Sequence, residues 1–170
     1  MKRAAVILCM DIGLAALLMP LAVPNRVQIV YNPSDSVPRG WYRIGPADSL
    51  QVGSIVLARL PAPAAALAAQ RDYLPAGIPL IKRIGAMAPQ RVWVDGASVR
   101  IDDVAATSVR RADERGRSLL SWQQCRRLAH GELFLLSNTN PASFDSRYFG
   151  PIRASDVIGG AQPLWTWSTP

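Results

Sequence analysis

The chain has 170 residues, 49% of them hydrophobic and 18% charged, which is typical of a globular domain rather than a disordered chain. Its net charge is +7, but the arginines of the domain are scattered, with no basic helix or interleaved aromatic platform, so we expect no nucleic-acid partner. A single histidine and two cysteines exclude a multi-histidine metal site and a disulfide framework, and we expect neither a metal nor a cofactor.

A hydrophobic segment precedes the domain. Residues 4–23 are mostly apolar and would span about 30 Å as a helix, the thickness of a bilayer's hydrocarbon core. Because residues 1–3 are basic, we expect them in the cytoplasm as a short tip, with residues 26–170 exported as one catalytic domain and lipid as a partner. Asp11 would be costly near mid-bilayer, by about 3 kcal/mol. A cleaved signal peptide is the alternative, but a cut after Ala22 would follow a poor cleavage site.

The remaining sequence predicts a mainly β domain. Its 14 prolines and 12 glycines indicate many turns and short strands. Alternating or continuous apolar runs predict strands at residues 26–31, 41–44, 54–60, 79–84, 91–94, 98–101 and 131–136 and from 157 onward. One short helix is expected within 61–73, a surface excursion at 107–127 and a loop at 138–151. Asp95-Gly96 is a strong hairpin signal, and βαβ alternation is missing from the pattern.

The first candidate for chemistry is Ser36, in the turn-rich stretch 32–40, which reads NPSDSVPRG. A serine in such a stretch is most often only a solvated turn residue. A turn also presents a hydroxyl in the open, where it can act as a nucleophile. Backbone N–H groups and the nearby Ser34 hydroxyl can then stabilise an oxyanion.

A partner for this serine is Lys82. Beyond the N-terminal tip it is the only lysine, and unlike arginine a lysine can lose its proton when desolvated. On an alternating strand it shares its face with Leu80 and Ile84, an apolar setting. Bringing its pKa near neutrality needs about 4 kcal/mol, which burial can supply, and a neutral lysine can then act as the base of a Ser-Lys pair. A Ser-His-Asp triad would instead have to use His130, the only histidine.

The third stretch is SFDSRYFGP, residues 143–151. In an extended chain Ser143, Asp145 and Arg147 would share one side. Asp145 and Arg147 can form an ion pair that fixes this segment, and such a structural salt bridge is the main role we expect for them. The Ser143 hydroxyl can orient a lysine amine.

Together the three stretches make the chain resemble the Ser-Lys signal peptidase family, and more closely its conjugative-transfer branch, the TraF-type pilin peptidases. The resemblance implies a signal-peptidase-like β catalytic domain preceded by one N-terminal transmembrane helix. It implies a single-pass protein of the bacterial inner membrane, with its catalytic domain in the periplasm. The scissile peptide would bind as an added strand.

The resemblance also implies a role for each matching residue. These roles are nucleophile for Ser36, general base for Lys82, oxyanion hole for Ser34, orientation of Lys82 for Ser143, and support of the catalytic loop for Asp145 and Arg147. The implied substrate is a precursor pilin or preprotein, and further partners would be other components of a conjugative secretion system. Hydrolysis and cyclisation of the product use the same Ser36 acyl intermediate, so the sequence leaves both open.

Two departures from the housekeeping enzymes favour a dedicated peptidase. Residues 137–139 read Ser-Asn-Thr in place of Gly-Asp-Asn, and one residue rather than two separates Ser36 from Pro38. Two alternatives remain at this point. One is a general type I signal peptidase acting on many preproteins, and the other is a non-enzymatic scaffold of a secretion system.

Overall fold

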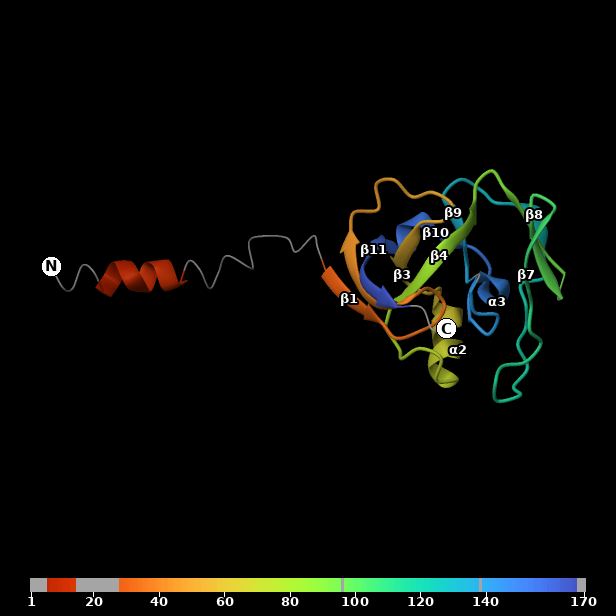
Figure 1. Cartoon of the computed structure of the whole chain (residues 1–170), viewed down its shortest axis with the longest axis horizontal. Helices are drawn as coiled ribbons and strands as arrows, with labels where there is room; N and C mark the ends of the chain where they lie inside the picture. The colour runs from red at the N-terminus through yellow and green to blue at the C-terminus, as the bar shows by residue number, and fades with distance from the viewer. Residues whose placement is uncertain (1–5, 15–27, 96, 138, 168–170) are drawn as a thin grey trace.

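The computed structural model describes residues 6–14, 28–95, 97–137 and 139–167. Residues 6–14 are helical, and a mainly β domain follows them in the chain (Figure 1). Among the described residues, no helix has both the length and the apolar character needed to cross a membrane. The tip at 1–3 and most of the segment 4–23 lie outside the described ranges, so the single-pass anchor stays a prediction.

The domain is built from short strands joined by two helices and a 3₁₀ turn. The strands are β1 (Gln28–Asn32), β2 (Arg39–Gly45), β3 (Ile55–Ala58), β4 (Leu80–Met87), β5 (Arg91–Val94), β6 (Ser98–Ile101), β7 (Val104–Ser108), β8 (Cys125–Arg127), β9 (Glu132–Leu136), β10 (Ile152–Arg153) and β11 (Val157–Trp167). The helices are α2 (Ala62–Gln70) and α3 (Ser146–Phe149), and the 3₁₀ turn is Ala154–Asp156.

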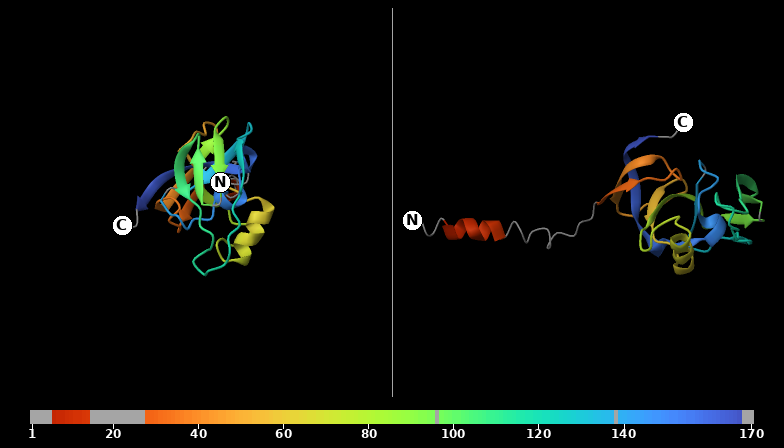
Figure 2. Two further views of the ribbon diagram at one scale, coloured as in Figure 1. Left: turned by 90° about the vertical axis from the view of Figure 1, so that its right-hand side faces the viewer. Right: turned by 90° about the horizontal axis from the view of Figure 1, so that it is seen from below.

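The strands form two antiparallel sheets. The larger has seven strands in the order β1-β2-β11-β3-β4-β9-β10, and the smaller has four in the order β7-β6-β5-β8. In Figure 1 and in the right panel of Figure 2, β1 lies at one end of the domain and the four-stranded sheet lies at the other end. In β2 buried and exposed residues alternate, the pattern expected where only one face of a strand is buried.

Strand β4 lies between β3 and β9 in the larger sheet and carries Lys82 opposite Val56. The pairing of β4 with β9 shifts between Ile84 and Ala86, which leaves Gly85 in a β-bulge. A side chain would not fit at Gly85, because an added Cβ would lie 2.8 Å from the side chain of Leu136. The bulge therefore depends on glycine at this position.

Buried apolar side chains form three clusters. One joins the smaller sheet to β9 and α3, and its buried members are Ala86, Val92, Val94, Val99, Val109, Leu128, Phe134, Leu136 and Tyr148. In the larger sheet, Leu80 and Ile84 belong to one cluster and Ile81 to another. The predicted faces of β4 are thus confirmed, with Leu80 and Ile84 on one side and Ile81 on the other.

Most predicted elements are present, and β5 and β6 have the predicted bounds. Two expectations are wrong. The predicted excursion at 107–127 contains β8, which pairs with β5 although it is only three residues long and carries two arginines. The predicted loop at 138–151 contains α3, because the Asp145 side chain accepts a hydrogen bond from the backbone N–H of Arg147 (3.2 Å) and so caps the helix N-terminus.

Candidate active site

Ser36 lies in the turn between β1 and β2 and is only 4% exposed. The turn is held from inside by Asn32, whose side-chain amide donates hydrogen bonds to the carbonyls of Ser34 (2.9 Å), Val37 (3.3 Å) and Pro38 (3.2 Å). Asn32 is not among the site residues predicted from the sequence. Its signal was an asparagine at the end of a strand and before a proline, where an Asn side chain commonly organises a turn.

The hydroxyls of Ser34 and Ser36 are hydrogen-bonded, with 2.8 Å between their oxygens. Because the single Ser34 proton is donated to Asn32 Oδ1 (2.9 Å), Ser34 accepts the bond from Ser36. The structure thus brings Ser34 beside the candidate nucleophile. To donate to an oxyanion, the Ser34 hydroxyl would have to turn from Asn32 toward a substrate.

Lys82 is 6% exposed, and its Nζ donates a 2.5 Å hydrogen bond to Ser143 Oγ. Burial lowers the pKa of Lys82 from 10.5 to about 8, while the nearby charges act in opposite directions, Asp145 raising it and Arg147 lowering it. Desolvation of the ammonium is the dominant cause. The arrangement therefore gives an amine that is partly neutral near neutral pH and is oriented by a serine, as predicted for Ser143.

Ser36 and Lys82 line one cavity of about 920 Å³, together with Ser34 and Ser143. Among the described residues, no hydrogen bond joins Ser36 directly to Lys82, and His130 is exposed and does not line this cavity. In the part of the chain that the structure describes, no three His, Cys, Asp or Glu side chains are placed to hold a metal ion. The cavity thus offers two groups for acyl transfer, a hydroxyl and a desolvated amine.

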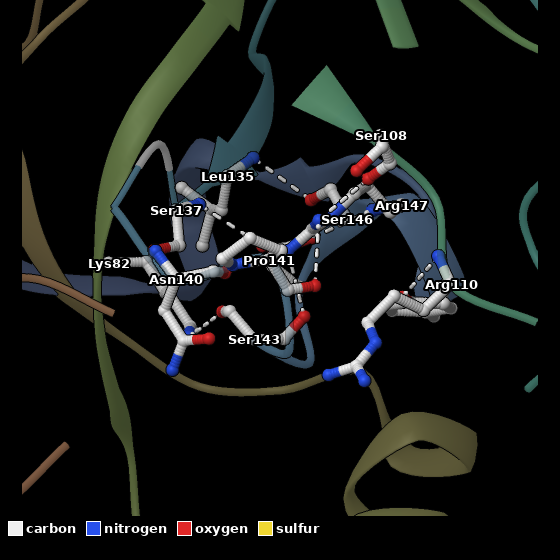
Figure 3. A network of polar contacts seen from close by, with 12 residues as sticks. Lys82, Ser108, Arg110, Leu135, Ser137, Asn140, Pro141, Ser143, Ser146 and Arg147 are labelled. Carbon is white, nitrogen blue, oxygen red and sulfur yellow. Dashed lines mark hydrogen bonds and ion pairs between the residues drawn. The ribbon is translucent and has the colours of Figure 1, made fainter. Parts of the chain in front are cut away.

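A buried ion pair supports the lysine side of the cavity (Figure 3). Asp145 and Arg147 are both fully buried and form a bidentate pair, with Nε and Nη2 each 2.8 Å from a carboxylate oxygen. Arg147 also donates to the carbonyls of Ser143 (2.9 Å) and Ser108 (2.8 Å), and Asp145 accepts from the backbone N–H of Ser137 (3.0 Å). The predicted pair is confirmed, and it holds the segment that carries Ser143.

The backbone of this segment differs from the prediction. Ser143, Asp145 and Arg147 do not share one side of an extended chain, because the chain turns into α3 directly after Asp145. Ser146, a buried serine that was not among the predicted site residues, fixes the turn, and its Oγ accepts a hydrogen bond from the backbone N–H of Leu135 in β9 (2.9 Å). The capped helix therefore brings Arg147 back toward the carbonyl of Ser143.

A further contact joins the two candidate loops. The Thr139 hydroxyl donates to the carbonyl of Asp35 across 104 residues of sequence (3.0 Å). Asp35 is itself paired with Arg39, the first residue of β2. The serine turn and the segment before Ser143 are therefore connected directly, as well as through the cavity that they share.

The chain matches known proteins over most of its length. The sequence model of the family described as "Signal peptidase, peptidase S26" matches residues 1–167. A probable conjugal transfer protein TraF of Sinorhizobium fredii is 35% identical, over 81% of this chain and 77% of that protein. A conjugal transfer protein TraF of Agrobacterium tumefaciens is 33% identical, over 98% of this chain and 97% of that protein.

Among solved structures, the chain is similar to a signal peptidase I of Enterococcus faecalis. The TM-score is 0.42 at 20% identity, over 67% of this chain and 97% of that one. The family match over nearly the whole chain and the TraF relatives confirm the resemblance drawn from the three sequence motifs. The chain belongs to the signal peptidase family, peptidase S26.

Proposed function

We propose that the chain is a membrane-anchored serine endopeptidase that uses a Ser-Lys dyad, with Ser36 as nucleophile and Lys82 as general base. One observation carries the proposal: a buried lysine with a pKa of about 8 lines the same cavity as a buried serine. A lysine in water would be protonated at neutral pH and could not accept a proton. The desolvated amine of Lys82 is neutral in part of the molecules and can accept a proton.

The proposed reaction has two steps. Ser36 Oγ attacks the scissile carbonyl carbon while Lys82 Nζ takes its proton, and the resulting oxyanion is stabilised by backbone N–H groups and by the Ser34 hydroxyl. Collapse breaks the C–N bond, and Lys82 returns the proton to the leaving amine, which leaves an ester on Ser36. A water molecule or an amine then attacks the ester, and Ser36 recovers its proton.

The proposed substrate is an exported precursor, and among such precursors a pilin subunit. Support comes from the relatives, which carry the names conjugal transfer protein and plasmid transfer protein. If water attacks the Ser36 ester, the product is linear, and if the N-terminal amine of the same chain attacks, the product is cyclic. Both products require the same dyad.

The proposed location is the bacterial inner membrane, with the domain in the periplasm. Support is the apolar sequence of residues 4–23 behind a basic tip. This segment would place the cavity near the bilayer in which an exported precursor is itself inserted. The prediction can be checked by labelling the exposed Cys125 in intact cells and in spheroplasts with a membrane-impermeant thiol reagent.

The function is tested by expressing the full chain with the candidate pilin precursor and measuring the mass of the product. Wild type should shorten the precursor, whereas Ser36→Ala and Lys82→Ala should leave it intact. A product lighter than the linear peptide by one water indicates cyclisation. Normal processing by both variants would overturn the dyad and favour a scaffold, and cleavage of unrelated preproteins would indicate a general signal peptidase.

A further inference from the structure

A second loop, distant in sequence from the Ser36 turn, also reaches the cavity. Residues 111–119 form a small hairpin, in which Ala112 bridges Ser118 and the Leu119 N–H donates to the Arg111 carbonyl (2.8 Å). This hairpin lies beside the C-terminal end of α2, whose next residues are 71–73 (Figure 2). We call these two segments, residues 71–73 and 111–119, the clasp.

Asp113 is the centre of the clasp, and its side chain is 8% exposed. It pairs with Arg117 (Nε to Oδ2, 2.7 Å) and accepts hydrogen bonds from the Tyr73 hydroxyl (2.5 Å) and from the backbone N–H of Arg115 (3.0 Å). Burial raises the pKa of Asp113, but the hydrogen bonds from Tyr73 and Arg117 outweigh it and hold the pKa below its usual range. The carboxylate therefore stays ionised at any pH at which a peptidase would be assayed.

More contacts connect the two segments of the clasp. Arg71 donates to the Ser118 carbonyl (2.8 Å), and Arg117 donates to the Arg71 carbonyl (2.9 Å). The Arg117 guanidinium lies 5.4 Å from the ring centre of Tyr73. Arg115 and Asp72 form a further ion pair (2.9 Å), which is largely exposed. The hairpin is thus fastened to the end of α2 by several independent contacts.

The clasp forms part of the wall of the cavity that Ser36 and Lys82 line. Its residues in the wall are Arg71, Asp72, Tyr73, Asp113, Glu114, Arg115, Arg117 and Leu119. Three arginines and three carboxylates balance one another here, in a chain whose net charge is +7. Away from the clasp, most of the wall is apolar, including Leu57, Ile78 and Ile81. An uncharged peptide segment would therefore enter at the lowest desolvation cost.

The clasp also contacts the segment that holds the lysine. The ring of Tyr73 packs on Phe144, with 5.3 Å between ring centres, and Phe144 directly follows Ser143. Just before the hairpin, the backbone N–H of Arg110 donates to the Tyr148 hydroxyl in α3 (3.2 Å). A peptide that touches the clasp therefore lies close to the group that orients Lys82.

Building on the proposed function, we infer that the clasp is the specificity-determining wall of the cavity. It admits an extended, uncharged stretch of precursor to Ser36, and Asp113 and Tyr73 are the residues that position it. The clasp comes from residues outside the three motifs that carry the chemistry. Its shape can therefore set which precursor is accepted without altering the dyad.

The test uses the full chain and two substrates. One is a synthetic peptide that spans the cleavage site mapped in the precursor, and the other is p-nitrophenyl acetate, a small ester that can acylate Ser36 without touching the clasp. Asp113→Asn should raise KM for the peptide about tenfold, as expected for losing a hydrogen-bonded charge, while kcat falls less than threefold. Tyr73→Phe removes the hydroxyl that donates to Asp113 but keeps the ring on Phe144, and it should also raise KM, by a smaller factor.

Glu132→Gln is the matched control, because Glu132 also pairs with an arginine, Arg126 (2.6 Å), but does not line the cavity. It should leave KM unchanged. An unchanged KM in Asp113→Asn would overturn the inference. So would equal losses with the peptide and the ester, which would mean that Asp113 only stabilises the fold.

The proposed Ser-Lys chemistry and the role of the clasp can be refuted independently of each other. If the wild type shows no acylation that depends on Ser36, the dyad is refuted, and the clasp is then tested by the binding of purified precursor to the Ser36→Ala chain. Adding Asp113→Asn to that chain should weaken the binding about tenfold. Unchanged binding would refute the clasp alone.

Discussion

The replacement of Lys82 by arginine separates a general base from a mere positive charge. At pH 7 a lysine with a pKa of about 8 is neutral in about one molecule in ten, against about one in three thousand at the ordinary value of 10.5. Arginine fits a similar volume but stays protonated in a protein. We therefore expect Lys82→Arg to lose about a hundredfold to ten-thousandfold in activity, the range that general-base catalysis contributes, and to be as inactive as Lys82→Ala.

The assay follows acylation of Ser36 by p-nitrophenyl acetate and cleavage of the precursor peptide between pH 5 and pH 10. Below the pKa of Lys82 the neutral fraction rises tenfold for each unit of pH, and above it the fraction levels off. The rate of the wild type should rise in the same way and reach a plateau above about pH 9. Lys2→Arg makes the same chemical change at the other lysine and should behave as the wild type does.

Two results would refute this reasoning. Substantial activity in Lys82→Arg would mean that a permanent positive charge serves as well as a neutral amine. A rate that does not change between pH 5 and pH 9 would mean that no group with a pKa near 8 limits the reaction. A large loss in Lys2→Arg would show that the assay responds to something other than the active site.

Three more predictions concern the same groups. The stability of the wild type relative to Lys82→Met should rise by about 3 kcal/mol between pH 8 and pH 10.5. In this pH range Lys82 still carries its proton in the unfolded chain but has lost it in the folded chain. A stability difference that stays constant over this range in urea denaturation would contradict the prediction. Arg147→Met should cost about 3–5 kcal/mol in the same measurement, because it leaves a buried carboxylate unpaired, whereas Arg39→Met, at a pair that water screens, should cost far less. Ser143→Ala should lower kcat about tenfold to a hundredfold with little change in KM, because Lys82 loses the acceptor that orients it; unaltered kinetics would exclude that role.

Much of the fold could be predicted from local patterns. Alternation between apolar and polar residues is enough to locate strands such as β5 and β6, and the turn signal between them predicts their pairing. Strand β8 and helix α3 were missed because each has only three or four residues, too few for a periodic signal. Their formation depends on partners elsewhere, β5 for β8 and the Asp145 cap for α3.

The chemistry was predictable for a different reason. A lone lysine on an apolar strand face is unusual in itself, and burial then explains why its pKa falls. The clasp has no comparable signal. Asp113 and Arg117 look like an ordinary solvated pair four residues apart, and nothing in the local sequence indicates that Tyr73, 40 residues away, completes it. Asn32 did carry a local signal, because it ends a strand and precedes a proline, but its three carbonyl acceptors come within reach only when the turn has closed.

The buried ion pair does more than support the fold. An unpaired Asp145 carboxylate near Lys82 would favour the ammonium and raise the pKa of the base, and the Arg147 charge acts in the opposite direction. Since the two charges lie within hydrogen-bond distance of each other, their fields at Lys82 largely cancel, and desolvation decides the protonation state. Arg147 thus has a chemical effect as well as a structural one. With Arg147 present, the Asp145 carboxylate can hold the Ser143 segment in place without raising the pKa of Lys82 so far that the amine stays protonated.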